Sequence, residues 1–263
     1  LMLSGGGHNC MTCEANGDCR LQDAAYELGI ETPAYTIESL TEPIVDDSSQ
    51  MIIRDNKKCI LCRRCVIACN QIVGNEVLGM GYRGGDSVII CDDDKPMGSS
   101  SCVQCGECVQ KCPVGALVDK KSVGKARTWE TRKVRTTCPY CGVGCQLNLH
   151  VKGDQIVKVT GVEDALPNEG RLCVKGRYGY DFIYSGERLT QPLIKENGSF
   201  REASWEEALD LVASRFKETI EEYGPDSVAG VSSARSKNED SYFMQKLFRG
   251  VYQSPNIDHC ART

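Results

Sequence analysis

The sequence predicts a series of small α+β domains that are folded around metal ligands, followed by the start of an open α/β domain. Two observations predict this order. The 263 residues include 17 cysteines, most of them in short C-x2-C runs with little apolar sequence around them. Metal ligation rather than a large hydrophobic core therefore folds the first half of the chain. Residues 191–263 instead alternate amphipathic helix, strand and helix, as expected for an open α/β sheet.

Two ferredoxin-type runs lie at the centre of this arrangement, in a predicted domain at residues 50–122. The second run reads C-x2-C-x2-C-x3-C-P at residues 102–113, and the first has the same cysteine spacing at residues 59–69. In bacterial ferredoxins the fourth cysteine of such a run ligates the neighbouring cluster. One predicted [4Fe–4S] cluster therefore has the ligands Cys59, Cys62, Cys65 and Cys112. The other has the ligands Cys69, Cys102, Cys105 and Cys108.

The alternative of zinc is disfavoured for these two runs, because zinc sites use pairs of C-x2-C and half of the thiols would remain unused. Short strands are predicted at residues 51–54 and 87–91. Cys91, which closes the second strand, fits no ligand spacing and is predicted to be a small buried apolar residue.

A further cysteine group lies in residues 1–45, ahead of a short amphipathic helix at residues 21–28 that Gly29 ends. His8, Cys10, Cys13 and Cys19 make a complete set of four ligands. Their spacing, with the following Arg20-Leu-Gln-Asp, resembles the His(Cys)3 [4Fe–4S] segment of complex I large subunits and iron-only hydrogenases. Those families have H-x3-C where this chain has H-x-C, so the alternative is that His8 only flanks the glycines at 5–7.

Residues 120–135 are basic and polar, and we interpret them as a linker or a solvated face, with the linker between domains at residues 123–133. Docking to an acidic partner is the weaker alternative. A predicted small β-rich domain at residues 134–190 follows. It holds Cys138, Cys141, Cys145 and Cys173. Alternating apolar segments at 147–151 and 155–159 predict a hairpin that brings the distant fourth cysteine back. Spacing alone leaves zinc open for this group.

The residues around this last group resemble the cluster domain of molybdopterin oxidoreductases, and within them formate dehydrogenases. The resemblance lies in Cys138-Pro-Tyr-Cys-Gly-Val-Gly-Cys, in Gly170-Arg-Leu-Cys-Val-Lys-Gly-Arg-Tyr and in the segment 256–263. It implies a fourth [4Fe–4S] cluster and a molybdenum or tungsten bis(molybdopterin guanine dinucleotide). It also implies that Lys175 lies between cluster and pterin and relays electrons, the alternative being a surface lysine.

The remaining residues, 191–263, are predicted to begin the α/β molybdopterin oxidoreductase domain. Ser204 and Glu207 form a capping box for a helix with an apolar face, which Gly224-Pro225 ends. A short buried strand at 227–232 and a second amphipathic helix at 239–252 follow. The loop at 232–239 lies where such sheets bind ligands, or is simply solvated.

Both ends of the chain suggest a fragment. The chain starts with Leu1, and the resemblance places the cysteine or selenocysteine ligand of the active-site metal directly after Thr263. We expect a UGA codon there. Cys260 precedes that position and is not predicted to be the ligand, so the chain as given is expected to be inactive.

The function predicted from the resemblance is that of a formate dehydrogenase catalytic subunit, with formate or CO2 as substrate and a flavin/NAD(P) subunit, ferredoxin or hydrogenase as redox partner. The alternatives are a non-catalytic electron-transfer subunit of complex I type, or another molybdopterin oxidoreductase such as nitrate reductase. Reduced thiols and the lack of a signal peptide favour an anaerobic cytoplasm. The net charge of −5 gives no reason to expect nucleic acid, and no apolar run is long enough to span a membrane.

Overall fold

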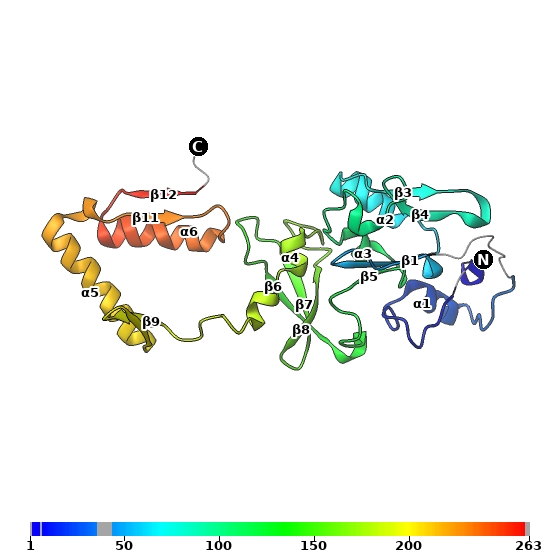
Figure 1. Ribbon diagram of the computed structural model, residues 1–263, viewed down its shortest axis with the longest axis horizontal. Helices are drawn as coiled ribbons and strands as arrows, with labels where there is room; N and C mark the ends of the chain where they lie inside the picture. Colours follow the sequence, from blue (N-terminus) through cyan, green and yellow to red (C-terminus); the bar gives the residue numbers. More distant parts are fainter. Residues whose placement is uncertain (1, 6, 36–43, 261–263) are drawn as a thin grey trace. The chain divides into compact units, whose positions relative to one another are not determined.

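The computed structural model describes residues 2–5, 7–35 and 44–260 (Figure 1). The chain divides into two compact units. Unit 1 comprises Leu1–Thr137 and Cys145–Tyr180, and unit 2 comprises Cys138–Gly144 and Asp181–Thr263. Residues 36–43 of the predicted first segment and the last three residues, with Thr263, lie outside the described part. The predicted fold class, α+β iron–sulfur domains followed by the start of a molybdopterin domain, is confirmed.

The ferredoxin-type part of unit 1 is built on an antiparallel sheet of order β1-β2-β5, with β1 at Val45–Asp46, β2 at Ile52–Asp55 and β5 at Leu117–Asp119. The hairpin of β3 (Leu78–Gly81) and β4 (Val88–Cys91) lies between the two cysteine runs. Each predicted strand is found to within one residue. Short helices lie within the runs: α2 at Arg64–Ile67, continued by a π-helical turn at Ala68–Val73, and α3 at Glu107–Lys111.

The core of this part is small. Its buried members are a few aliphatic residues and three cysteines: Ile52, Cys65, Val77, Leu78, Ile89, Cys91, Met97, Cys108 and Leu117. The interior position predicted for Cys91 is therefore confirmed, since its side chain is completely buried. A core in which two of the buried residues are predicted ligands depends on those ligands for much of its cohesion.

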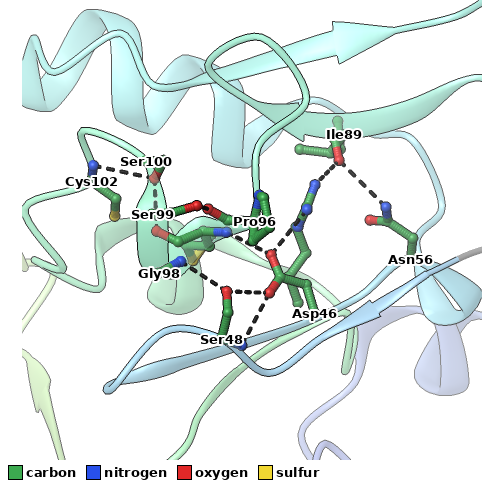
Figure 2. Close-up of polar contacts among 11 residues, drawn as sticks. Asp46, Ser48, Asn56, Ile89, Pro96, Gly98, Ser99, Ser100 and Cys102 are labelled. Carbon is green, nitrogen blue, oxygen red and sulfur yellow. Dashed lines mark hydrogen bonds and ion pairs between the residues drawn. The ribbon is translucent and has the colours of Figure 1, made fainter.

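A buried polar network ties strand β1 to the loop ahead of Cys102 (Figure 2). Asp46 accepts hydrogen bonds from Arg54 Nη2 at 3.0 Å and from the backbone N–H of Met97 at 2.8 Å. Its other oxygen accepts from the hydroxyl and N–H of Ser48, at 2.5 and 3.1 Å. Arg54 also donates from Nη1 to the carbonyl of Ile89 in β4. Four chain segments, β1, β2, β4 and the loop at Met97, are therefore joined by one carboxylate and one guanidinium.

The second part of unit 1 is an antiparallel sheet of order β6-β7-β8, with β6 at Arg132–Thr137, β7 at Gln146–Lys152 and β8 at Gln155–Gly161. The predicted hairpin is confirmed as β7 and β8. Helix α4 (Val174–Tyr178) follows Cys173 and packs on this sheet. Strand β8 ends where the backbone passes Gly170 so closely that a Cβ on Gly161 would lie 1.9 Å from the Gly170 carbonyl oxygen.

Two cations of the basic segment make contacts within the fold that its composition did not predict; the interpretation of residues 123–133 as a linker stays a prediction. Lys121 donates to the carbonyl oxygen of Tyr178 at 2.7 Å and lies over the ring of Tyr180. Arg127 donates to the carbonyl oxygens of Cys13 and Met11 at 2.7 and 3.1 Å. These cations contact backbone carbonyls and a ring that a composition argument could not foresee. Arg132 and Lys133 already belong to strand β6.

Unit 2 contains the hairpin β9 (Leu193–Glu196) and β10 (Ser199–Glu202), then helix α5 at Trp205–Tyr223. The predicted cap is confirmed, since Ser204 Oγ accepts from the N–H of Glu207 at 3.1 Å. Strands β11 (Gly230–Ser232) and β12 (Ile257–His259) pair in parallel, as in an open α/β sheet. The predicted burial of the first strand is wrong at Val231, which is exposed.

The second predicted helix of this unit begins at Asn238 as α6 (Asn238–Gln245) and continues as a π-helical segment, Lys246–Tyr252. Phe216 of α5 stacks on Tyr252 with ring centroids 4.8 Å apart, which joins the two helices. Much of the predicted apolar face of α5, including Trp205, Leu209 and Val212, is exposed. Among the helices of the described ranges, none is long and apolar enough to cross a membrane.

Candidate iron–sulfur sites

Two cavities in the ferredoxin-type part contain the eight thiols predicted as ligands. The first is lined by Cys59, Cys62, Cys65 and Cys112. The second is lined by Cys69, Cys102, Cys105 and Cys108. Each cavity thus receives three cysteines from one run and the fourth from the other. The structure brings together both predicted groups of four; that they bind clusters remains a prediction.

The two runs reach their cavities through the same unusual backbone. Leu61 and Arg63 in the first run have φ of 54° and 59°, and Gln104 and Gly106 in the second have φ of 53° and 76°. Alternating left-handed residues turn successive N–H groups toward one concave side, where they favour negative charge. The N–H of Leu61 lies 3.4 Å from Cys59 Sγ, and that of Gln104 lies 3.4 Å from Cys102 Sγ.

Burial in these cavities disfavours free thiolates. Burial, reinforced by the neighbouring thiolates of Cys59, Cys112 and Cys62, raises the pKa of Cys65 to about 12. Burial and the charges of neighbouring cysteines likewise raise the pKa of Cys108 well above its usual value. Four thiolates crowded in such a space are stable only when a metal centre neutralises them, and a coordinating thiol is then deprotonated outright.

The donor set of these sites suits an iron–sulfur cluster. Four thiols line each cavity together with apolar residues, such as Ile89 and Leu117 in the first. Cysteines with the spacing of these two runs are the usual ligands of [4Fe–4S] clusters.

The N-terminal group is brought together in part. The pKa of Cys19 is raised by burial and by the nearby charges of Cys13 and Cys10, so these three thiols lie near one another. His8 Nε2 lies 3.3 Å from the carbonyl oxygen of Met2. The role of His8 as a ligand remains a prediction. Arg127 holds this segment in place through the carbonyl oxygen of Cys13.

The fourth group is divided between the units. Cys138 and Cys141 belong to unit 2, and Cys145 and Cys173 to unit 1. Cys138 is buried, Cys141 and Cys145 are half-buried, and Cys173 is exposed at the start of α4. Lys175 is exposed on the same helix, two residues further on. Their assignment to one cluster, and the relay role of Lys175, stay predictions.

Sequence reasoning missed two buried arginines beside the cavities. Arg54 lines the first cavity and is ion-paired with Asp46 at 3.0 Å. Arg177 of α4 is ion-paired with Glu107 at 3.2 Å, next to a cysteine run of the second cavity. Neither follows from any local pattern, because each partner is fixed by tertiary contact. The sequence places Arg177 four residues after Cys173 and Arg54 five residues before Cys59, and this proximity to predicted ligands was the only indication of a role near the clusters.

Comparison with known domains accounts for most of the chain. Residues 131–185 match the molybdopterin oxidoreductase Fe4S4 domain, and residues 188–263 match the molybdopterin oxidoreductase domain. The chain belongs to the molybdopterin oxidoreductases. Ahead of these domains, residues 1–34 match the NADH-ubiquinone oxidoreductase-G iron–sulfur binding region. Residues 49–118 match the ferredoxin-like domain of NADH-quinone oxidoreductase subunit 3.

Curated relatives of this molybdopterin oxidoreductase match it over nearly its whole length. The "Probable oxidoreductase YjgC" of Bacillus subtilis is 38% identical over 96% of the chain. The "Putative formate dehydrogenase SH0748" of Staphylococcus haemolyticus is 34% identical over the same share. The chain spans about 30% of the length of either relative.

Among solved structures, an NAD+-reducing [NiFe]-hydrogenase is 30% identical, with 48% of this chain and 54% of that chain covered and a TM-score of 0.44. Acetylene hydratase from Pelobacter acetylenicus is 23% identical, with 49% and 18% covered and a TM-score of 0.41. The matched domains establish the coarse chemistry: an oxidoreductase chain with iron–sulfur domains and part of a molybdopterin domain.

Proposed function

We propose that the complete protein is the catalytic subunit of a formate dehydrogenase, which converts formate to CO2, a proton and two electrons, or runs the reverse reaction. The observation that carries this proposal is the 34% identity over 96% of the chain with proteins whose printed name is "Putative formate dehydrogenase". The terminal segment 256–263 and Lys175 support it, because both resemble that family.

The chain's own residues would serve this reaction by holding clusters in a row. A bound molybdenum– or tungsten–pterin group would supply the two-electron chemistry. The thiols of Cys138, Cys141, Cys145 and Cys173 would hold the cluster next to Lys175. The exposed ammonium of Lys175 lies two residues from Cys173, where a cation favours the reduced state of a cluster.

From there electrons would cross the two cavities of the ferredoxin-type part and reach the N-terminal group. That group would be held by Cys10, Cys13, Cys19 and His8. A long row of clusters implies a redox partner, for which we propose a flavin/NAD(P) subunit, a ferredoxin or a hydrogenase. Ligand thiols must stay reduced, so the proposed location is the cytoplasm.

A second candidate is an electron-transfer subunit of complex I type without catalysis. The observation that favours it is the match of residues 1–34 and 49–118 to NADH-ubiquinone and NADH-quinone oxidoreductase domains. The two candidates share the clusters and differ in the metal–pterin group. Metal content therefore separates them.

The test is anaerobic purification of the complete protein, followed by analysis of iron, sulfide, molybdenum and tungsten and by formate-dependent reduction of a viologen dye. Iron, sulfide and either molybdenum or tungsten, together with dye reduction, support the first candidate. Iron and sulfide alone support the second. Zinc in place of iron contradicts both candidates. A rate of dye reduction that is the same with and without formate contradicts formate as the substrate.

A matched pair of variants tests the relay. Lys175→Met is expected to retain all metals and to slow formate-dependent dye reduction at least about tenfold. This corresponds to an activation free energy that is higher by about 1.4 kcal/mol. Lys125→Met, which removes an exposed lysine of the basic segment, is expected to change neither. Equal rates in the two variants would contradict the relay role.

A further inference from the structure

Arg177 is the most deeply enclosed cation next to the predicted clusters. It lies on α4 with 2% of its surface exposed. Its Nε donates to the carbonyl oxygen of Cys105 at 2.9 Å, and Nη2 lies 3.2 Å from Glu107 Oε2. Nη1 donates to Gln110 Oε1 at 2.8 Å. A buried guanidinium with this set of acceptors is held in one orientation.

Gly106 and Gln110 form the space that the Arg177 side chain occupies. Gly106, directly after Cys105, has φ of +76°, and a Cβ there would lie 2.3 Å from Arg177 Cδ. Gln110 in turn donates to the Gly170 carbonyl oxygen at 3.0 Å and accepts from the Gly161 N–H at 2.9 Å. The arginine therefore fills a space that a glycine leaves open, between the cysteine run and the sheet β6-β7-β8.

This single residue joins two predicted ligand residues of different clusters. The N–H of Arg177 donates to the carbonyl oxygen of Cys173 at 3.1 Å, and its Nε donates to the carbonyl oxygen of Cys105 at 2.9 Å. A continuous path of covalent bonds and two hydrogen bonds therefore runs from one cysteine to the other. Both cysteines lie in unit 1.

The charge of Arg177 also acts on the cluster ligand. Arginine remains charged at every pH of interest. Its Nε is hydrogen-bonded directly to the backbone carbonyl of Cys105, so its positive charge lies close to this ligand residue. A cluster gains one negative charge on reduction, so a cation close to its ligands raises its reduction potential.

We propose that Arg177 is a positioning residue that raises the reduction potential of the cluster held by Cys69, Cys102, Cys105 and Cys108, and links it to Cys173. This inference rests on the proposed ligation of that cluster. It assigns a role in electron transfer to a side chain that lies outside every ligand motif.

Two substitutions in the complete, cluster-loaded protein test this role. Arg177→Met keeps the length of the side chain and removes its charge and hydrogen bonds, whereas Arg177→Lys keeps the charge but cannot reproduce the contacts that the three guanidinium nitrogens make with three different acceptors. Arg171→Met is the matched control, since Arg171 is an exposed arginine in the same domain. Each protein is analysed for iron and sulfide, and its clusters are titrated by redox-poised electron paramagnetic resonance.

We expect full iron content and a shift of one cluster to more negative potential in Arg177→Met, a smaller shift in the same direction in Arg177→Lys, and none in Arg171→Met. Unchanged potentials in a fully loaded Arg177→Met protein would overturn the role. If Arg177→Met loses iron, the potential of the Arg177→Lys protein is the test, and an unchanged potential in that variant overturns the role of Arg177. Lack of iron and sulfide in the unsubstituted protein would instead contradict the cluster assignment itself.

Discussion

Replacement of Asp46 by asparagine tests whether the buried network of Figure 2 holds the ferredoxin-type part together. The carboxylate is 7% exposed and accepts hydrogen bonds from Ser48, Met97 and Arg54. Burial alone would raise the pKa of Asp46, but the hydrogen bonds from Ser48, Met97 and Arg54 outweigh it and lower the pKa to about 2. The carboxylate is therefore bound more tightly as an anion than in the unfolded chain.

The magnitude follows from two estimates. A pKa of about 2 against an ordinary value of 3.8 corresponds to about 2 kcal/mol of stability at neutral pH. Removing one partner of a buried ion pair costs about 3–5 kcal/mol, since Arg54 would remain buried without its counter-charge. We expect Asp46→Asn to lose about 2–4 kcal/mol of local stability.

The assay is native-state hydrogen exchange at the amides of strand β2. A loss of this size speeds exchange roughly 30-fold to 1,000-fold, at about 1.4 kcal/mol for each factor of ten. Asp47→Asn is the matched control, because the neighbouring Asp47 pairs with Lys120 at the surface, with 63% of its side chain exposed. Such a pair contributes at most about 1 kcal/mol. Similar exchange in the two variants would refute the argument.

Three further predictions use the same part of the chain. The stability that Asp46 contributes is present above its ordinary pKa and is lost as the pH falls through its folded-state pKa of about 2. The difference in iron-release rate between wild type and Asp46→Asn should therefore become smaller as the pH is lowered from about 5 to 3. Cys91→Ala should keep its full iron and sulfide content and lose about 1 kcal/mol, as for deletion of a group the size of a methylene; loss of iron would make Cys91 a ligand. Gly106→Ala should lower the thermal midpoint of cluster loss by more than Gly84→Ala, because both positions have positive φ but only Gly106 faces Arg177; equal midpoints would contradict that contact.

Local spacing explains what could be predicted. Ligands at x2 and x3 intervals must lie in one turn of chain, so the exchange of Cys69 and Cys112 between the two runs followed from the motif itself, and the cavities gather these thiols accordingly. Caps and turns are equally local: Ser204 opens α5, and the Lys152–Asp154 segment turns β7 into β8. Such features depend on residues only a few positions apart.

The contacts made by the cations could not be predicted, because they join residues that are far apart in the sequence. Arg127 binds the carbonyl oxygen of Cys13, 114 residues away, and Arg177 binds that of Cys105, 72 residues away. Composition marks such residues as surface charges, and only the packed chain shows that backbone carbonyls receive them.

The sequence by itself thus predicted which thiols line each of the two cavities and which kind of domain follows which, because ligand spacing and helix or hairpin signals are short-range. Only the tertiary structure decided which charges surround those thiols. A buried guanidinium is stable only where several distant acceptors converge on it, and that convergence at Arg54 and Arg177 exists only once the chain is folded.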